Sequence, residues 1–153
     1  MTAAAPYVLS AISGGSSRPW HYASSVDEQR KVVDRLLGET EGHVLFYVWD
    51  RPAGRASDDY PGQQLKIVYR NRYGAAHFTN SDPAHGPVGA WLAHLDRPHL
   101  DAPKPIYDPW DPERVTIPDD AVLSIDQLRT IVAEYARTGR QPANLMWTAV
   151  DFV

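Results

Sequence analysis

Four histidines in the second half of the chain are the first candidates for chemistry, because imidazole binds metals and acts as a general base near neutral pH. They are His77, His85, His94 and His99. No two of them have the i, i+4 helical spacing with a neighbouring glutamate that a zinc protease requires. His94 and His99 lie five residues apart in a proline-rich stretch. These side chains are therefore expected in loops or at the surface, and we predict no metal and no cofactor.

Two pairs of adjacent acids, Asp58–Asp59 and Asp119–Asp120, could also bind a cation. A calcium loop needs alternating acids around a central glycine, which neither pair has, so both are expected to be solvated turn acids. The segment Gly14–Ser17 lacks the lysine of a phosphate-binding loop and the Gly-x-Ser-x-Gly order of a nucleophile turn. A cysteine nucleophile is excluded because the chain has no cysteine. With no catalytic constellation, the protein is predicted not to be an enzyme.

A proline-rich stretch at residues 81–122 carries the acidic excess of the chain. Segment 101–120 holds six acids and two bases, and the resulting charge of −4 equals that of the whole chain. Large aromatic residues flanked by charge are typical of protein interfaces. The interface candidates are Asp58, Asp59, Tyr60, Tyr107, Asp108, Trp110, Asp111, Asp119 and Asp120. For Trp110 the alternative is burial beneath its own loop.

Composition limits the class of protein. The chain has 153 residues, of which 43% are hydrophobic and 22% charged, as in an ordinary single globular domain spanning residues 1–153. No apolar run approaches the roughly 20 residues of a membrane helix, so no membrane partner is expected. The net charge of −4 argues against direct nucleic-acid binding. The lack of cysteine fits a reducing cytoplasm.

Two capped helices should position these residues. Ser124, with Gln127 three residues later, forms a capping-box pattern, and Gly139 ends the helix where a left-handed residue is favoured. The apolar residues between them recur at i, i+3, i+4 and i+7, which predicts one buried face. A second capped helix is predicted between Ser25 and Gly38.

Alternation of apolar and polar residues predicts strands between and beside these helices. The expected strands are residues 7–12, 43–49, 64–70, 75–80 and 144–150. Segment 43–49 is apolar on both faces, which predicts a central strand covered on both sides. In segment 64–70 the apolar residues face inward, and Lys66 and Arg70 face outward into solvent.

Segments 50–63 and 81–122 are predicted to be loops. Trp91, Leu92 and Leu95 are expected to form a short helical turn within the second. The predicted fold class is α+β, a single mainly antiparallel sheet packed against two principal helices. The long proline-rich acidic loop region at about 81–122 belongs to the same domain.

The C-terminal block resembles a known family. Residues 124–147 contain a capped helix, the Thr-Gly-x-x-Pro turn at 138–142 and a closing strand with Leu145-Met146-Trp147. This order resembles the ending of immunity protein family one of bacterial polymorphic toxin systems. The segments around 66–78 resemble the middle of the family. The loop at 96–118 has no counterpart.

The resemblance implies an α+β cytoplasmic protein that binds and neutralises a cognate toxin, commonly a nucleic-acid deaminase, without enzymatic activity or cofactor. Gly139, Pro142 and Trp147 match the family motif, and Trp147 is expected to be structural because it shares a strand face with Leu145. An acidic surface suits a toxin with a basic active-site cleft, which it would cover. The alternative is a small α+β ligand-binding domain or enzyme that uses loop histidines and acids.

Overall fold

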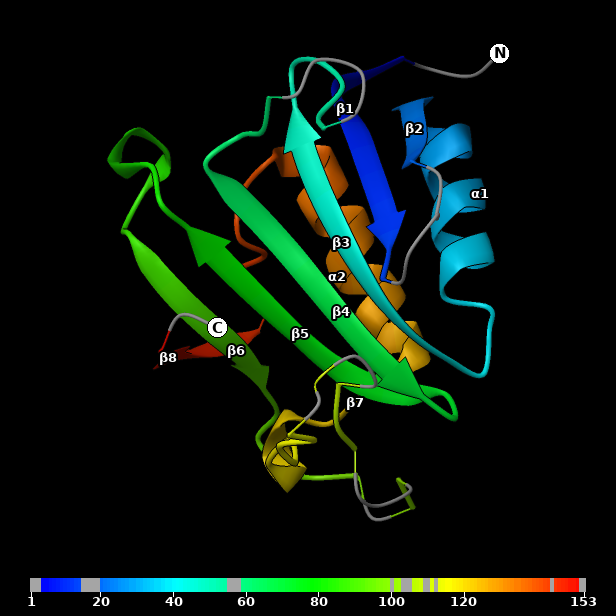
Figure 1. Cartoon of the computed structure of the whole chain (residues 1–153), viewed down its shortest axis with the longest axis vertical. Coiled ribbons are helices and arrows are strands. Elements are labelled where there is room, and N and C mark those ends of the chain that lie inside the picture. Colours follow the sequence, from blue (N-terminus) through cyan, green and yellow to red (C-terminus); the bar gives the residue numbers. More distant parts are fainter. Residues whose placement is uncertain are drawn as a thin grey trace.

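A computed structural model describes residues 4–14, 20–54, 59–99, 101–102, 106–108, 111, 113–143 and 145–151. Within these residues one antiparallel sheet carries two helices on one of its faces (Figure 1). The predicted α+β class is therefore confirmed. Neither helix is long and apolar enough to span a membrane, as judged over the described part of the chain.

The strands are β1 (Ala4–Ser13), β2 (Trp20–Ser25), β3 (Glu41–Trp49), β4 (Gln63–Arg70), β5 (Tyr73–Asn80), β6 (Gly89–His94), β7 (Leu123–Ser124) and β8 (Met146–Val150). The helices are α1 (Val26–Leu36) and α2 (Ile125–Thr138), with short 3-10 turns at Pro83–His85 and Asp119–Ala121. The described strands follow the order β2-β1-β3-β4-β5-β6-β8, and the short β7 pairs with β5. Every pairing is antiparallel.

Both helices begin and end as their sequences predict. The Ser124 hydroxyl accepts the backbone N–H of Gln127, and the Gln127 side chain accepts the backbone N–H of Ser124 at 2.8 Å. Gly139 ends α2 with a φ of +67°, where a side chain would be strained. Ser25 caps α1 by accepting the N–H of Glu28. Local capping chemistry thus sets the helix boundaries.

Strands β4 and β5 match the strands expected at 64–70 and 75–80 and pair as a hairpin, in which β5 begins earlier than expected, at Tyr73. Asn71 and Arg72 alone form the turn, with φ values of +52° and +72°. Two successive left-handed residues make the turn type whose twist matches that of paired strands. The register then places Lys66 opposite His77.

The structure corrects one sequence prediction and adds one strand. Trp91 and Leu92 lie in strand β6, not in a helical turn. The i, i+1, i+4 spacing with Leu95 is compatible with a helix. As a strand, however, the segment pairs with the edge of β5, whose backbone groups would otherwise lack partners. It also places Trp91 against the core on one side of the sheet and Leu92 against the core on the other side. Strand β2 was not predicted, because it is short and continues directly into the Ser25 cap of α1.

The sheet is covered differently on its two faces. On the helix side a large core contains Phe46, Ile67 and Tyr135, all less than 2% exposed. On the other face a smaller core joins Val68 and Leu92 to the loop that follows β6. Its members are Val68, Ala75, Leu92, Ile106, Ile117, Ala121 and Val122. We call this second face of the sheet the open face.

Candidate functional site

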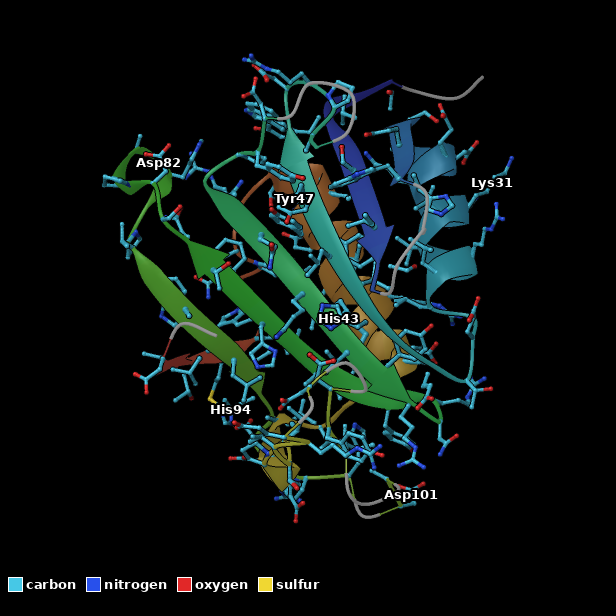
Figure 2. All side chains as sticks on the ribbon, in the orientation of Figure 1. Lys31, His43, Tyr47, Asp82, His94 and Asp101 are labelled. Atoms are coloured by element: carbon cyan, nitrogen blue, oxygen red, sulfur yellow. The ribbon has the colours of Figure 1, made fainter. Side chains whose placement is uncertain are left out.

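The open face brings together side chains from strands that are distant in sequence. Its middle and one end are lined by alternate residues of β3, β4 and β5, which point away from the helices. Figure 2 shows His43 and Tyr47 on this face of β3, in front of the sheet, with α2 behind. Three groups of residues occupy the face: an aromatic cluster, a central polar cluster and the anchored loop.

The aromatic cluster consists of Trp20, Tyr22, Tyr47 and Tyr60. Tyr47 packs against Trp20 with ring centroids 5.9 Å apart and against Tyr60 at 5.3 Å. Burial raises the pKa of Tyr47 to about 12, so its hydroxyl stays protonated and donates to Gln64 Oε1 at 2.6 Å. Tyr60 remains 54% exposed on top of this support. The cluster therefore presents one rigidly backed aromatic ring to solvent.

The central polar cluster consists of His43, Lys66, His77 and Asp108. Asp108 contacts His43 Nδ1 at 2.9 Å and Lys66 Nζ at 3.8 Å, and all three side chains are 16% exposed. Burial and the nearby Lys66 charge lower the pKa of His77 to about 4, so this imidazole is neutral at pH 7. Its Nδ1 atom is buried with no hydrogen-bond partner among the described residues.

The anchored loop, residues 95–122, is fastened to the sheet by polar contacts. Tyr107 lies between the guanidinium groups of Arg70 and Arg114, at 5.5 Å and 5.4 Å from its ring centroid. Asp111 accepts the backbone N–H groups of Glu113 and Val115 at 2.9 Å and 3.2 Å. These contacts hold the described parts of the loop in a defined shape.

Other acids of the anchored loop are exposed to solvent. Asp119 and Asp120 form a 3-10 turn at the end of β6, and both are exposed. The Asp120 carboxylate also contacts His94 Nδ1 at 3.3 Å. Glu113 and Asp101 are exposed as well. The loop therefore combines inward acids that fasten it with outward acids that face solvent.

The structure sorts the interface candidates into two groups. Asp59, Tyr60, Asp119 and Asp120 are exposed. Tyr107, Asp108 and Asp111 are partly buried and make the contacts within the chain described above. Asp58 and Trp110 lie outside the described residues.

The histidines considered for metal binding do not converge. His77 lies on β5, His94 pairs with Asp120, and His85 lies 3.4 Å from Asp82 in the turn at Pro83–His85. His99 contacts Gln127 Oε1 at 2.8 Å. The described part of the chain contains no group of three or more histidines or acids arranged to hold a metal ion.

The sequence did not indicate that the four residues of the central polar cluster meet, although His77 and Asp108 were already candidates for other roles. The residue pattern places His43 only at the start of a strand and Lys66 in solvent, whereas both side chains are 16% exposed in the structure. The register of the β4–β5 hairpin could have paired Lys66 with His77, since a two-residue turn defines the register. Nothing local could have placed Asp108 beside His43, which is 65 residues away in the chain.

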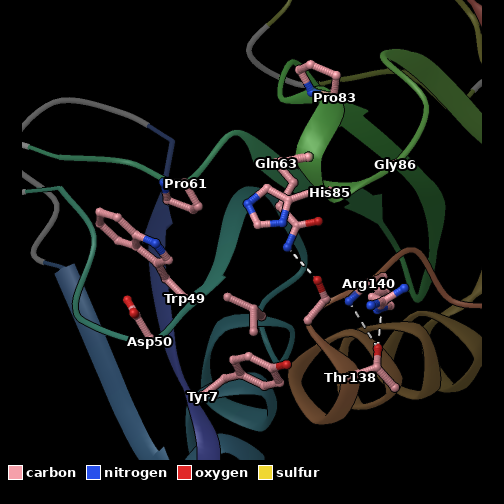
Figure 3. Close-up of a pocket in the computed structure, with 13 residues that line it drawn as sticks. Tyr7, Trp49, Asp50, Pro61, Gln63, Pro83, His85, Gly86, Thr138 and Arg140 are labelled. Carbon is pink, nitrogen blue, oxygen red and sulfur yellow. Dashed lines mark hydrogen bonds between the residues drawn. The ribbon is translucent and has the colours of Figure 1, made fainter.

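A separate cleft of about 540 Å³ lies at the C-terminal end of α2. Its lining includes Trp49, His85 and Arg140 (Figure 3). Its floor is the turn that ends the helix, where the Gln63 side chain donates to the Gly139 carbonyl. A Cβ atom on Gly139 would lie 3.2 Å from the Tyr7 ring. The cleft is thus formed by the same turn whose pattern resembles the family motif.

The closing strand explains the other two motif residues. Trp147 packs against the helix-side core, with its ring centroid 6.3 Å from that of Phe78. The Trp147 indole N–H donates to the Pro142 carbonyl at 2.7 Å. Trp147 thereby fastens β8 to the turn after α2, and a structural role fits all three motif residues.

Comparison with known proteins places the chain in a family. The sequence model of Immunity protein Imm1 matches residues 19–149, which run from the start of β2 almost to the end of β8. This span contains the aromatic cluster, the central polar cluster, the anchored loop and the motif residues. No protein with a curated description matches the chain. Because the match covers most of its length, the chain belongs to the Imm1 immunity protein family and is an immunity protein against a toxin.

Proposed function

We propose that this immunity protein neutralises a deaminase toxin that acts on nucleic acid, and that it does so in the cytoplasm by covering the basic active-site cleft of the toxin with its open face. No catalysis by the immunity protein is required, because the complex itself denies the substrate access. The observation that carries the proposal is the exposure of four acids in the loop that packs on the open face, Asp101, Glu113, Asp119 and Asp120, which we call the acidic rim.

Charge supports a basic partner surface. In the anchored loop Asp101, Glu113, Asp119 and Asp120 are exposed, with Asp120 also in contact with His94, and Asp108 is half-buried beside His43 and Lys66. An enzyme that binds nucleic acid carries positive charge around its cleft. Complementary potentials accelerate association and disfavour wrong partners. The exposed acids therefore suit a toxin of this class better than an acidic or neutral one.

The aromatic cluster supports a contact with the toxin that dissociates slowly. Tyr60 is exposed, yet its ring already packs against Trp20 and Tyr47. An aromatic side chain held in place before binding loses little conformational entropy on association. Aromatic residues of this kind often contribute most of the binding energy of an interface. Asp59 precedes Tyr60 in the sequence and is exposed as well, and Asp58 and Trp110 stay interface candidates from the sequence.

The test uses the toxin domain encoded next to the immunity gene, in a bacterial strain where that toxin arrests growth. Co-expression of the immunity protein should restore growth, and the purified protein should abolish deamination of nucleic acid in vitro at equimolar concentration. Growth rescue by a protein that leaves deamination unchanged would contradict cleft coverage. No rescue and no binding would contradict the proposed partner.

Within that assay, an excess of nucleic-acid substrate distinguishes two modes of inhibition. A protein that covers the cleft should compete with substrate, so that the apparent inhibition constant rises in proportion to substrate concentration. Inhibition that does not depend on substrate concentration would indicate a remote binding site on the toxin.

A further inference from the structure

The two edges of the sheet differ in how they are protected. At one edge, helix α1 follows β2 directly and lies beside it (Figure 1), and the pairing of β1 with β2 contains a register shift. At the other edge, β8 pairs with β6 on one side, and no strand among the described residues pairs with its other side. The backbone groups on that side of β8 can therefore pair with a further strand.

Strand β8 has none of the features that prevent a sheet edge from pairing. Natural proteins protect such edges with charged residues, prolines or bulges. The five residues Met146–Val150 include no charged residue and no proline, and all of them pair with β6 without a register shift. Met146, Thr148 and Ala149 are exposed, and Met146 is 51% exposed. A regular, uncharged and exposed edge of this kind is typical of a site where another strand is added.

We propose that β8 pairs with β8 of a second copy of this chain, antiparallel and about a two-fold axis at Thr148. In this register Thr148 lies opposite Thr148 of the second copy, Met146 lies opposite Val150, and Trp147 lies opposite Ala149. Each pair joins two apolar side chains or two hydroxyl groups, so no like charges meet across the strands. The pairing is closed, because each copy uses its β8 edge once, and it therefore produces a dimer.

The register of β6 and β8 shows which side chains would meet in the dimer. Thr148 pairs with Leu92, which belongs to the open-face core, so Met146, Thr148 and Val150 all point to the open face. The exposed Met146 side chain gains an apolar neighbour in Val150 of the second copy. The dimer therefore buries apolar surface that a single copy leaves in water.

The size of this contact predicts a weak dimer. A pair of five-residue strands is small beside the roughly 1,200 Å² that stable interfaces bury, so dimerisation should depend on protein concentration. The two-fold axis between antiparallel strands runs perpendicular to the sheet. Both open faces therefore lie on the same side of the joined sheet, and the pairing of the edges covers neither of them. This interaction surface does not depend on the proposed toxin contact.

Sedimentation equilibrium of the purified protein tests the dimer directly. The average mass of the wild type should rise from that of one chain towards that of two as the concentration is raised to about 1 mM. Thr148→Lys places two positive charges opposite each other at the axis and should raise the dissociation constant of the dimer about tenfold or more. Thr130→Lys is the matched control, because Thr130 is exposed on α2, and it should leave the dissociation constant unchanged.

A mixture of two variants tests the register. Thr148→Lys and Thr148→Glu should each dimerise weakly alone, but an equimolar mixture should dimerise at least as well as the wild type. Only the two-fold pairing places position 148 of one copy against position 148 of the other, where opposite charges attract.

Three results would overturn the proposal: a wild type that stays monomeric at about 1 mM, a dimer that Thr148→Lys does not weaken, or a mixture that associates no better than its components. If Thr148→Lys weakens toxin binding and leaves self-association unchanged, the β8 edge binds a strand of the toxin, and pairing with a second copy is equally refuted.

Discussion

The two faces of the sheet are held by different kinds of interaction. On the helix side, α1 and α2 cover a continuous apolar core in which side chains from most of the strands meet. On the open face, a smaller core is supplemented by single polar contacts such as Asp108 with His43 and Tyr107 with Arg70. Replacing an apolar core residue changes the packing of the whole core, whereas replacing one partner of a single polar contact changes only that contact.

This difference indicates that the two faces of the sheet have different roles. The helix side supplies most of the free energy of folding, so the open face can carry residues chosen for binding. Changes on the helix side should therefore act on stability, and changes on the open face should act on toxin binding. The predictions below compare the two faces directly.

The largest effect is expected from truncating one isoleucine in each core. Ile131 on α2 is 1% exposed, and Ile117 in the anchored loop is 8% exposed. Ile131→Ala should lower the free energy of unfolding by about 4 kcal/mol, and Ile117→Ala by about 2 kcal/mol. Denaturant unfolding with tryptophan fluorescence measures both. Equal losses would show that the loop core is as important to stability as the helix-side core.

Trp147→Ala should follow, with a loss of about 3 kcal/mol, because it removes packing against Phe78 and the bond to the Pro142 carbonyl. Toxin binding by the folded fraction should be unchanged. Trp147→Phe serves as the matched variant and should restore most of the stability. If the alanine variant keeps its unfolding midpoint but no longer binds toxin, Trp147 belongs to the interface.

Acid should destabilise the protein through His77. Its pKa is about 4 in the folded state and about 6.5 unfolded, so the unfolded chain binds the proton first as the pH falls. Stability from this group is nearly complete above about pH 7 and decreases towards pH 4, by about 2.5 kcal/mol at pH 4.5. The free energy of unfolding of the wild type and of His77→Gln, measured over this range, gives the difference. Parallel pH profiles would refute the assignment.

The cap of α2 should make a smaller contribution. Ser124→Ala removes the acceptor for the Gln127 N–H and should cost about 1 kcal/mol. Ser124→Asp keeps an acceptor at the same place and should be close to the wild type. Thermal or denaturant unfolding is sufficient, and toxin binding should not change. An unaffected Ser124→Ala variant would mean that β7, which pairs Ser124 with Tyr73, holds this end of the helix instead.

The smallest free-energy effect is expected at the acidic rim. Changing Asp119 and Asp120 together to asparagine should slow association with the toxin about twofold to threefold and leave dissociation nearly unchanged. The difference from the wild type should shrink with added salt, since the screening length falls from about 10 Å at 0.1 M to about 3 Å at 1 M. Asp34→Asn with Glu39→Gln is the matched control on the helix side. Equal slowing by both pairs would indicate net charge rather than a docking face.

The sequence alone determined the parts of the fold that depend on neighbours in the chain. The two helices, their caps at Ser25 and Ser124, the left-handed Gly139 and the β4–β5 hairpin all follow from contacts within a few residues. Such patterns constrain backbone conformation directly. The family motif at residues 138–147 was recognisable for the same reason. Its turn and strand are close in the sequence, and Trp147 bonds to Pro142 only five residues away, so the spacing of the motif residues is visible in the sequence.

Tertiary structure decided what depends on distant partners. Strand β6 forms because β5 offers an edge, whereas its own residues are also compatible with a helical turn. The central polar cluster requires β3, β4, β5 and the anchored loop, and Asp108 reaches His43 only after the sheet has formed. Burial then lowers the pKa of His77 and takes Lys66 out of bulk solvent. A residue's spacing in sequence carries no information about such contacts, because the sheet register and the path of the loop across it create them.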